Sequence, residues 1–218
     1  MTIVALAPMD LAALLCSRVC HDAISPVGAI VNGLEVLEDE KDPEMRAVAI
    51  ELIKKSAASA SALLQFCRLA FGAAGSIGAA VDTGDAESVT RGLIANERVS
   101  LVWNPTRQYA AKSKVKLLLN LNLIALSAIP RGGVVTVDLT GQDETLAIRV
   151  EAKGPKARLA HGVVELLAGR AESGAVDAHT IQPFFAGLVA RDCGMEVAIV
   201  AGPETVTLEA RPAKAVAA

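Results

Sequence analysis

The sequence DEKDP at residues 39–43 interrupts a long region in which apolar residues recur at helical spacing. Asp42 is expected to cap a helix that starts at Pro43, because aspartate accepts the free N–H groups of a first turn and proline has no N–H to leave unpaired there. Asp10 is the expected cap of the preceding helix. Residues 9–72 therefore predict two long helices that form an antiparallel hairpin.

Each of these helices carries one stripe of mostly apolar residues at steps of three and four. The stripe on the first helix consists of Leu11, Leu15, Val19, Ala23, Val27, Ile30, Leu34 and Leu37. The stripe on the second helix consists of Met45, Val48, Leu52, Ser56, Ala60, Leu63, Cys67 and Ala70. In a lone hairpin each helix has a single neighbour, so much of both stripes would stay in water. Two hairpins packed together as a four-helix bundle would bury them, which predicts a homodimer.

The composition favours a folded protein with an aliphatic core, since 52% of the residues are hydrophobic and only 3% are aromatic. The formal net charge of −3 does not fit the basic surface of a nucleic-acid-binding protein. The longest apolar stretch, residues 115–129, contains two asparagines and a serine and is shorter than the roughly 20 residues of a membrane span. We therefore expect a cytoplasmic protein that binds neither nucleic acid nor membrane.

Glycine and alanine dominate residues 72–78, which predicts a linker between a first domain at residues 1–75 and a second at residues 76–218. The second domain alternates segments of helical and β-strand character. Helices are predicted at residues 86–96, 112–129, 157–168 and 179–192. Strands are predicted at residues 99–103, 134–140, 145–152, 195–201 and 205–210. This order predicts an α+β domain in which helices cover one face of a largely antiparallel sheet.

His21 is the candidate functional residue of the first helix. It lies about 200° around the helix from Val19 and from Ala23, so its ring is expected to face away from the apolar stripe. The residues expected on the same face are Leu14, Ser17, Arg18, Ile24, Ser25 and Gly28. The exposed histidine is thus expected to be surrounded by two apolar side chains, a cation and bare backbone. This combination predicts a docking surface for a protein partner.

Asp22 and Pro26 add to the chemistry expected at His21. The Asp22 carboxylate is placed to accept the Nδ1 proton of the imidazole, which would leave Nε2 as the nucleophile. Pro26 is expected to bend the helix one turn further on. No second nitrogen nucleophile is expected near His21, because His161 and His179 have no adjacent acid and suit ordinary surface or core positions. An exposed His–Asp pair by itself is more often a solvated surface pair.

Cys16, Cys20 and His21 lie close together in the sequence, but they do not predict a metal site. The two thiols share a helix face from which His21 points away, and no second cluster of cysteine and histidine supplies further ligands. We therefore expect this chain to hold no metal ion of its own.

The sequence HDAISP at residues 21–26 resembles the H-box of sensor histidine kinases. In those kinases the box lies on the first helix of a dimeric hairpin, and its histidine is phosphorylated on Nε2. The resemblance implies a catalytic role for His21 and Asp22. It also places the second domain where the kinases carry their ATP-binding α/β sandwich.

The nucleotide-binding motifs of that family are degenerate in this chain. Residues 120–133 are similar to the N-box, but the family's Mg²⁺-binding asparagine falls on Ile124 and its lysine on Ser127. Residues 150–156 are similar to the first glycine box, but the aspartate that reads adenine falls on Ala152 and the second glycine on Lys156. The glycine-rich lid motif has no counterpart, since residues 182–188 read QPFFAGL. These losses remove ligands for Mg²⁺ and for phosphate, so we expect no ATP binding.

An intact H-box beside a degenerate ATP-binding domain resembles the ChpT-type histidine phosphotransferases of alphaproteobacteria. The resemblance implies a phosphorelay in which the receiver domain of a hybrid histidine kinase (CckA-like) donates the phosphoryl group to His21. Response regulators (CtrA-like and CpdR-like) would then accept it, and the required Mg²⁺ would belong to the receiver. Two alternatives remain open at this point: a dimeric docking scaffold for receiver domains without catalysis, and an atypical histidine kinase with an unusual nucleotide site.

Overall fold

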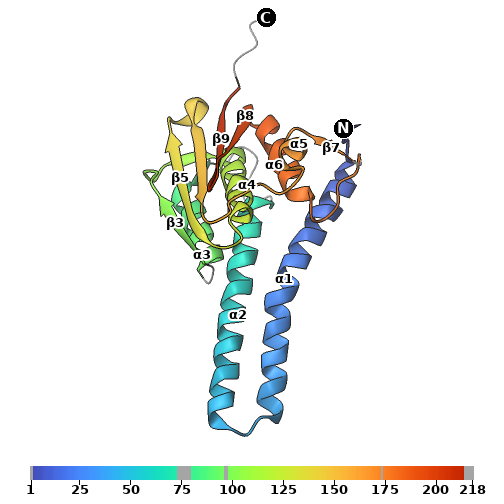
Figure 1. Ribbon diagram of the computed structural model, residues 1–218, viewed down its shortest axis with the longest axis vertical. Helices are drawn as coiled ribbons and strands as arrows, with labels where there is room; N and C mark the ends of the chain where they lie inside the picture. The colour runs from blue at the N-terminus through green and yellow to red at the C-terminus, as the bar shows by residue number, and fades with distance from the viewer. Residues whose placement is uncertain (1, 73–79, 96–97, 173, 214–218) are drawn as a thin grey trace, which may run out of the picture.

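The computed structural model describes residues 2–72, 80–95, 98–172 and 174–213, and a long antiparallel hairpin dominates its shape (Figure 1). Helix α1 spans Pro8–Asp39 and helix α2 spans Pro43–Ala70. The Asp42 side chain accepts the N–H of Glu44 at 3.2 Å, which confirms the cap predicted for α2. The cap predicted for α1 is wrong: Pro8 starts that helix earlier, Ala7 precedes it, and Asp10 lies in its first turn.

The inner face of the hairpin differs in part from the predicted stripe. Val27 and Leu34 are 47% and 49% exposed, so they lie outside the contact between α1 and α2. Gly33 is buried instead, and a Cβ added to it would meet the Ile53 side chain at 2.6 Å, so glycine allows close packing there. An apolar stripe is wider than one neighbouring helix, and its spacing does not show which half meets that neighbour. Pro26 lies inside α1, which changes direction along its length (Figure 1).

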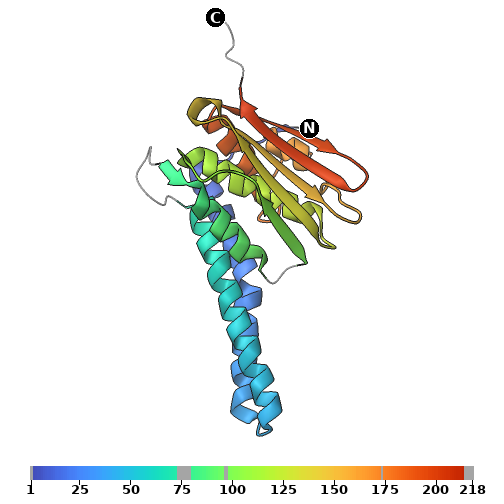
Figure 2. The same ribbon diagram turned by 90° about the vertical axis from the view of Figure 1, so that its left-hand side faces the viewer.

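The second part of the chain contains a five-stranded sheet in the order β3-β5-β6-β9-β8. These strands are β3 (Val99–Trp103), β5 (Gly133–Thr140), β6 (Ala147–Lys153), β9 (Thr205–Pro212) and β8 (Met195–Ala201). Strands β3 and β5 are parallel, and the other neighbours are antiparallel. Helices α3 (Thr83–Ile94), α4 (Lys112–Ala128) and α6 (Ile181–Asp192) complete this part, and α4 lies along one face of the sheet (Figure 2). The α+β architecture is as predicted.

The main core lies between α4 and the covered face of the sheet. Val135 and Val137 of β5 are fully buried, as are Leu117 and Leu121 of α4. The opposite face of the sheet is polar, and Arg149 there pairs with Asp138 and Glu209 on the two neighbouring strands and with Glu151 on its own strand. One buried and one solvated face is the usual arrangement of a mostly antiparallel sheet.

Short elements account for most differences from the predicted secondary structure. The helix predicted at residues 157–168 shrinks to α5 (Val163–Leu167), because Gly162 in front of it has a left-handed φ of 79°. The turn after β5 contains a 3₁₀ helix, η1 (Asp143–Thr145). Four strands of two or three residues were not predicted, since alternation cannot show in so few residues. They are β1 (Thr2–Ile3), β2 (Ala80–Asp82), β4 (Tyr109–Ala111) and β7 (Arg170–Ala171).

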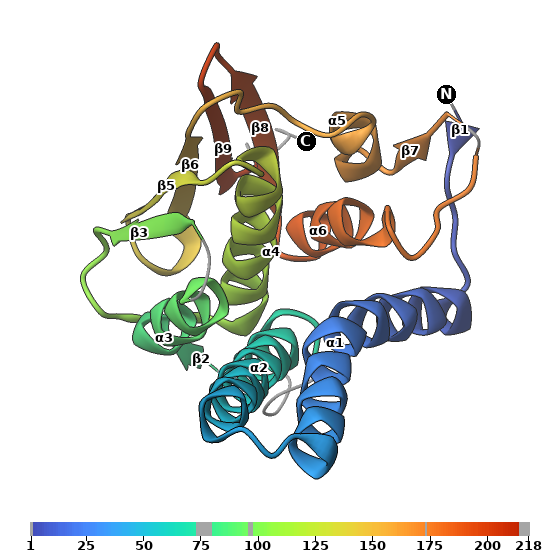
Figure 3. The ribbon, with the colours of Figure 1, turned by 60° about the horizontal axis from the view of Figure 1, so that its bottom comes forward.

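The beginning of the chain packs against the second part of the molecule. Strand β1 pairs antiparallel with β7, and Val4 joins a small cluster with Ile181 and Phe184 of α6. Leu11, Leu14 and Leu15 of α1 pack against this cluster, so the first turns of α1 lie beside α6 (Figure 3). The domain boundary predicted between residues 75 and 76 falls in residues 73–79, outside the described residues.

Candidate functional site

His21 lies on the N-terminal half of α1, and 62% of its side chain is exposed. Its Nδ1 is 3.2 Å from Oδ1 of Asp22, the contact expected from the sequence. In the tautomer that carries its proton on Nδ1, this nitrogen donates to the carboxylate and Nε2 keeps a free lone pair. The pair therefore presents a nucleophilic nitrogen at the surface.

Arg18 holds the other oxygen of the same carboxylate. Its Nε donates to Oδ2 of Asp22 at 2.7 Å, one helical turn away, and both side chains are about a third exposed. Its Nη1 donates to the main-chain carbonyl of His179 at 3.3 Å. Arg18 thus fixes the carboxylate that faces His21 and also contacts the segment that leads into α6.

His179 is the neighbour of His21 that sequence reasoning missed. The centroids of the two rings are 5.1 Å apart and their planes meet at 83°, an edge-to-face contact. The expectation that no second nitrogen nucleophile lies near His21 is therefore wrong. No local motif marked His179, because only the packing of α6 against α1 brings these distant residues together.

The other residues of the predicted docking face do not share one environment. Leu14 is half-buried against the cluster that includes Ile181 and Phe184, so contacts within the chain explain its apolar character. Ile24 is 69% exposed, and no such contact explains it. Ser17 and Ser25 are exposed, and a Cβ added to Gly28 would meet nothing within 4 Å. The open part of the face therefore runs from His21 toward the C-terminal half of α1.

Asn120, at the start of the segment that resembles an N-box, lies in the contact between α2, α4 and α6. Asn120 is fully buried, and its Nδ2 donates to the carbonyl of Ala70, at the end of α2, at 3.1 Å. Nε2 of Gln182 donates to the Asn120 carbonyl at 2.9 Å and lies 3.2 Å from Asn120 Oδ1. Ile124 on the same helix is buried in the main core. These contacts join the three helices α2, α4 and α6.

The region similar to the first glycine box is also part of the packed structure. Ala152 is fully buried in β6, and Lys156 adopts a left-handed φ of 59° in the loop that follows. Phe71 after α2 and Phe185 of α6 meet edge to face, with centroids 5.7 Å apart. Ala152 thus contributes to the packed core and offers no polar side-chain atom to a ligand.

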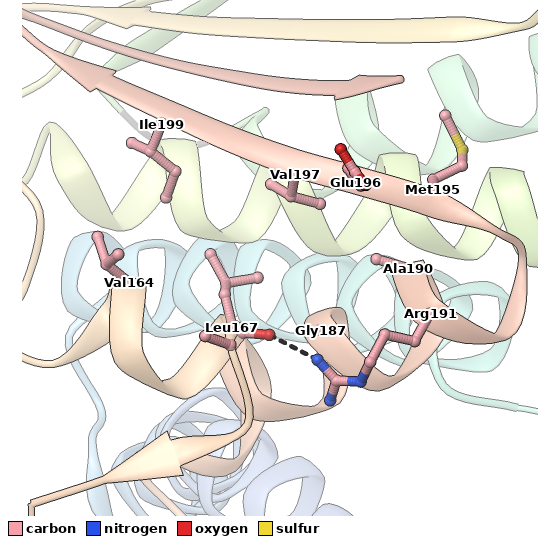
Figure 4. A pocket seen from close by; sticks show the side chains of 10 residues that line it. Val164, Leu167, Gly187, Ala190, Arg191, Met195, Glu196, Val197 and Ile199 are labelled. Carbon is pink, nitrogen blue, oxygen red and sulfur yellow. Dashed lines mark hydrogen bonds between the residues drawn. The ribbon is translucent and has the colours of Figure 1, made fainter. Parts of the chain in front are cut away.

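A cavity of about 420 Å³ opens between α5, α6 and β8, and no residue of α1 lines it (Figure 4). Val164, Leu167, Val197 and Ile199 give it apolar walls, and Arg191 Nη1 donates to the Leu167 carbonyl at 2.9 Å. Within the described part of the chain, no three His, Cys, Asp or Glu side chains are grouped so that they could hold a metal ion.

These features define a two-part protein in which a long helical hairpin carries an exposed histidine and is followed by a domain built on a five-stranded sheet. Residues 83–205 match the model of the histidine phosphotransferase C-terminal domain. The protein phosphotransferase ChpT of Brucella abortus (strain 2308) is 47% identical over 207 residues, which cover 95% of this chain and 98% of that protein. The chain therefore belongs to the histidine phosphotransferase family.

A solved structure shows the same similarity at the level of the fold. A bacterial phosphotransferase superposes with a TM-score of 0.88 at 44% identity, over 96% of this chain and 100% of the other. The Acinetobacter baumannii histidine kinase AdeS superposes with a TM-score of 0.46 at 9% identity, over 88% of this chain and 97% of the other.

Proposed function

We propose that His21 carries a phosphoryl group and passes it between aspartates of receiver domains, in a two-component phosphorelay. The observation that carries this proposal is the exposed imidazole whose Nδ1 faces Asp22, in a chain of the histidine phosphotransferase family. Exposure lets a partner's phosphoaspartate reach Nε2, and the Asp22 carboxylate favours the tautomer in which Nε2 is unprotonated.

The transfer needs little machinery from this chain. The Nε2 lone pair of neutral His21 forms a bond to phosphorus, while the bond from phosphorus to the aspartate oxygen breaks and its electron pair stays on the receiver's carboxylate. The Nδ1 proton remains on the ring, so the phosphorylated imidazole is cationic and faces Asp22. Loading of the next receiver is the reverse of this step. Positioning and charge neutralisation dominate such reactions, and the Mg²⁺ belongs to the receiver's acidic pocket.

We infer that the chain uses no ATP and binds no cofactor. Asn120 and Gln182 engage each other and the end of α2, and Ile124 and Ala152 are buried where kinases need polar ligands. A nucleotide could enter this region only by breaking hydrogen bonds that join three helices. These contacts disfavour the atypical kinase.

We propose that the chain is a homodimer through its hairpin. Exposed apolar residues continue along both helices between His21 and the turn of the hairpin, at steps of three and four. They are Ile24, Val27, Val31 and Leu34 of α1, and Met45, Val48 and Leu52 of α2. A contiguous apolar face of this kind is typical of a surface that a second copy covers, and two hairpins would then form a four-helix bundle.

The expected partners are the receiver domain of a CckA-like hybrid kinase and CtrA-like and CpdR-like response regulators. We place the chain in the cytoplasm, where these partners act, with no role for nucleic acid or membrane. By length and composition alone, helix α1 is long and apolar enough to cross a membrane. It is instead paired with α2, and its exposed apolar residues lie on the face assigned to the dimer.

The test of this proposal is incubation of the protein with a phosphorylated receiver domain, followed by mapping of the label. His21 should be labelled in the wild type. His21→Gln should take up no label while it keeps its melting temperature, since surface substitutions change stability by about 0.5 kcal/mol or less. His161→Gln is the matched control, because His161 is also exposed but lies outside this site. A folded His21→Gln protein that still accepts phosphate would overturn the proposal, whereas a wild-type protein that takes up no label would favour the docking scaffold.

A further inference from the structure

We propose that His179 is a positioning residue for His21: the edge-to-face contact between the two rings holds the His21 imidazole in the orientation needed for phosphotransfer. This inference rests on the proposed function of His21. It assigns part of the phosphotransfer site to the degenerate ATP-binding-like domain, from which His179 comes.

The contact matters because Asp22 alone does not fix the ring. A single hydrogen bond at Nδ1 leaves the imidazole able to swing about its side-chain torsions, and 62% of the side chain is exposed. The ring of His179, 5.1 Å away at 83°, limits that movement. Edge-to-face aromatic contacts are favourable and directional, so they select one orientation of a ring.

Four residues form a closed set of contacts around the nucleophile. His21 meets Asp22, Asp22 binds Nε of Arg18 at 2.7 Å, and Nη1 of Arg18 binds the His179 carbonyl at 3.3 Å. The His179 ring in turn makes the edge-to-face contact with the His21 ring. Loss of any one of these contacts therefore changes how the remaining side chains of the set are held in position.

His179 is itself held by a well-bonded turn. Oδ1 of Asp177 accepts from the His179 N–H at 3.0 Å, from the Thr180 N–H at 2.9 Å and from the Thr180 hydroxyl at 2.7 Å. The turn leads directly into α6, whose Ile181 packs in the cluster that α1 also contacts. The position of His179 relative to His21 thus depends on the packing of α6 against α1.

The inference implies that this domain supports catalysis without binding nucleotide. In histidine phosphotransfer the nucleophile must meet phosphorus in line, and small errors of orientation reduce the rate. A ring presented by the second domain makes the reactive orientation of His21 depend on the docked arrangement of the two parts of the chain.

The experiment compares His179→Ala, His179→Phe and the control His161→Ala in full-length protein. Single-turnover transfer from a phosphorylated receiver domain is followed at several receiver concentrations, which separates the saturating rate from the half-saturating concentration. Loss of one aromatic contact corresponds to roughly a two- to tenfold change. We expect His179→Ala to lower the saturating rate by that factor, His179→Phe to restore most of it, and His161→Ala to match the wild type.

A second readout does not require transfer. In NMR spectra the His21 ring-proton signals should shift in His179→Ala and stay in place in His161→Ala, because a neighbouring ring changes their shielding. Unchanged His21 signals together with a wild-type saturating rate in His179→Ala would overturn the inference. A loss that His179→Phe does not restore, or a change in half-saturation alone, would also overturn it. Absence of label on wild-type His21 would instead contradict the proposed function itself.

Discussion

Asp22 faces two side chains, with one carboxylate oxygen toward His21 and the other toward Arg18. Replacement of this aspartate by asparagine keeps its size and one oxygen acceptor but removes the charge. The negative charge favours the Nδ1-protonated ring and balances the cationic imidazole that forms on phosphorylation. Its two contacts make Asp22 the residue whose charge most directly tunes the nucleophile.

We expect Asp22→Asn to slow phosphotransfer to His21 by roughly tenfold or more without abolishing it, since a positioned charge contributes about 1–3 kcal/mol. The measurement is the single-turnover rate of label transfer from a phosphorylated receiver. Asp10→Asn is the matched control, because Asp10 is exposed in the first turn of the same helix. A wild-type rate in Asp22→Asn would show that its carboxylate has no part in the reaction.

At the scale of elements, α1 has three surfaces with different partners. Its first turns face α6, its inner side faces α2, and an exposed apolar row that starts at Ile24 faces solvent. Ile24 follows His21 by one turn and also begins the row assigned to the dimer. A substitution there therefore has to be tested for receiver binding and for assembly separately.

We expect Ile24→Glu to weaken receiver binding at least roughly tenfold, as loss of an interface anchor does. Val48→Glu should instead disrupt the dimer, because Val48 lies on the exposed apolar side of α2, in the part of the hairpin remote from His21. Receiver titration by calorimetry measures the first effect. Light scattering measures the second, with a wild-type mass of about twice the 22.5 kDa chain.

Two outcomes would contradict these assignments. A monomeric mass for the wild-type protein in light scattering would contradict the proposed four-helix bundle. An Ile24→Glu protein that binds receivers as tightly as the wild type would show that the docking surface does not include this part of α1.

At the scale of the whole molecule, the two segments that resemble nucleotide-binding motifs contribute to the packed interior. Ile124 and Ala152 are core residues, and Asn120 ties α4 to α2 and α6. Buried polar groups need partners, and the chain itself supplies those of the Asn120 side chain. The segment that resembles an N-box thus holds three helices together.

We expect no measurable binding of Mg²⁺–ATP in calorimetric titration at roughly millimolar nucleotide, which corresponds to less than about 4 kcal/mol of binding free energy. A histidine kinase ATP-binding domain is the positive control. Ile124→Asn alone should not restore binding, because Ala152 would still lack the carboxylate that reads adenine. Micromolar affinity in the wild type would revive the atypical kinase.

Much of the fold could be predicted because its determinants are local. Asp42 and Pro43 mark the start of α2, and apolar runs bounded by turns mark β3 and β8 with the observed ends. The His21–Asp22 contact was also predictable, since neighbours on one helix have few arrangements. Strands of two residues, such as β1 and β7, were not, because only their pairing defines them.

The sequence by itself determined the helical hairpin, the order along the chain of the five strands of the main sheet, and the exposed histidine with its acid. Only the tertiary structure decided which half of each apolar stripe faces inward, that Leu14 packs against the second part of the chain, and that His179 meets His21. The physical reason is the separation along the chain over which each kind of interaction acts. Caps, periodicity and charge act within a few residues, whereas these contacts exist only after α6 has packed against α1 and brought distant side chains to one place.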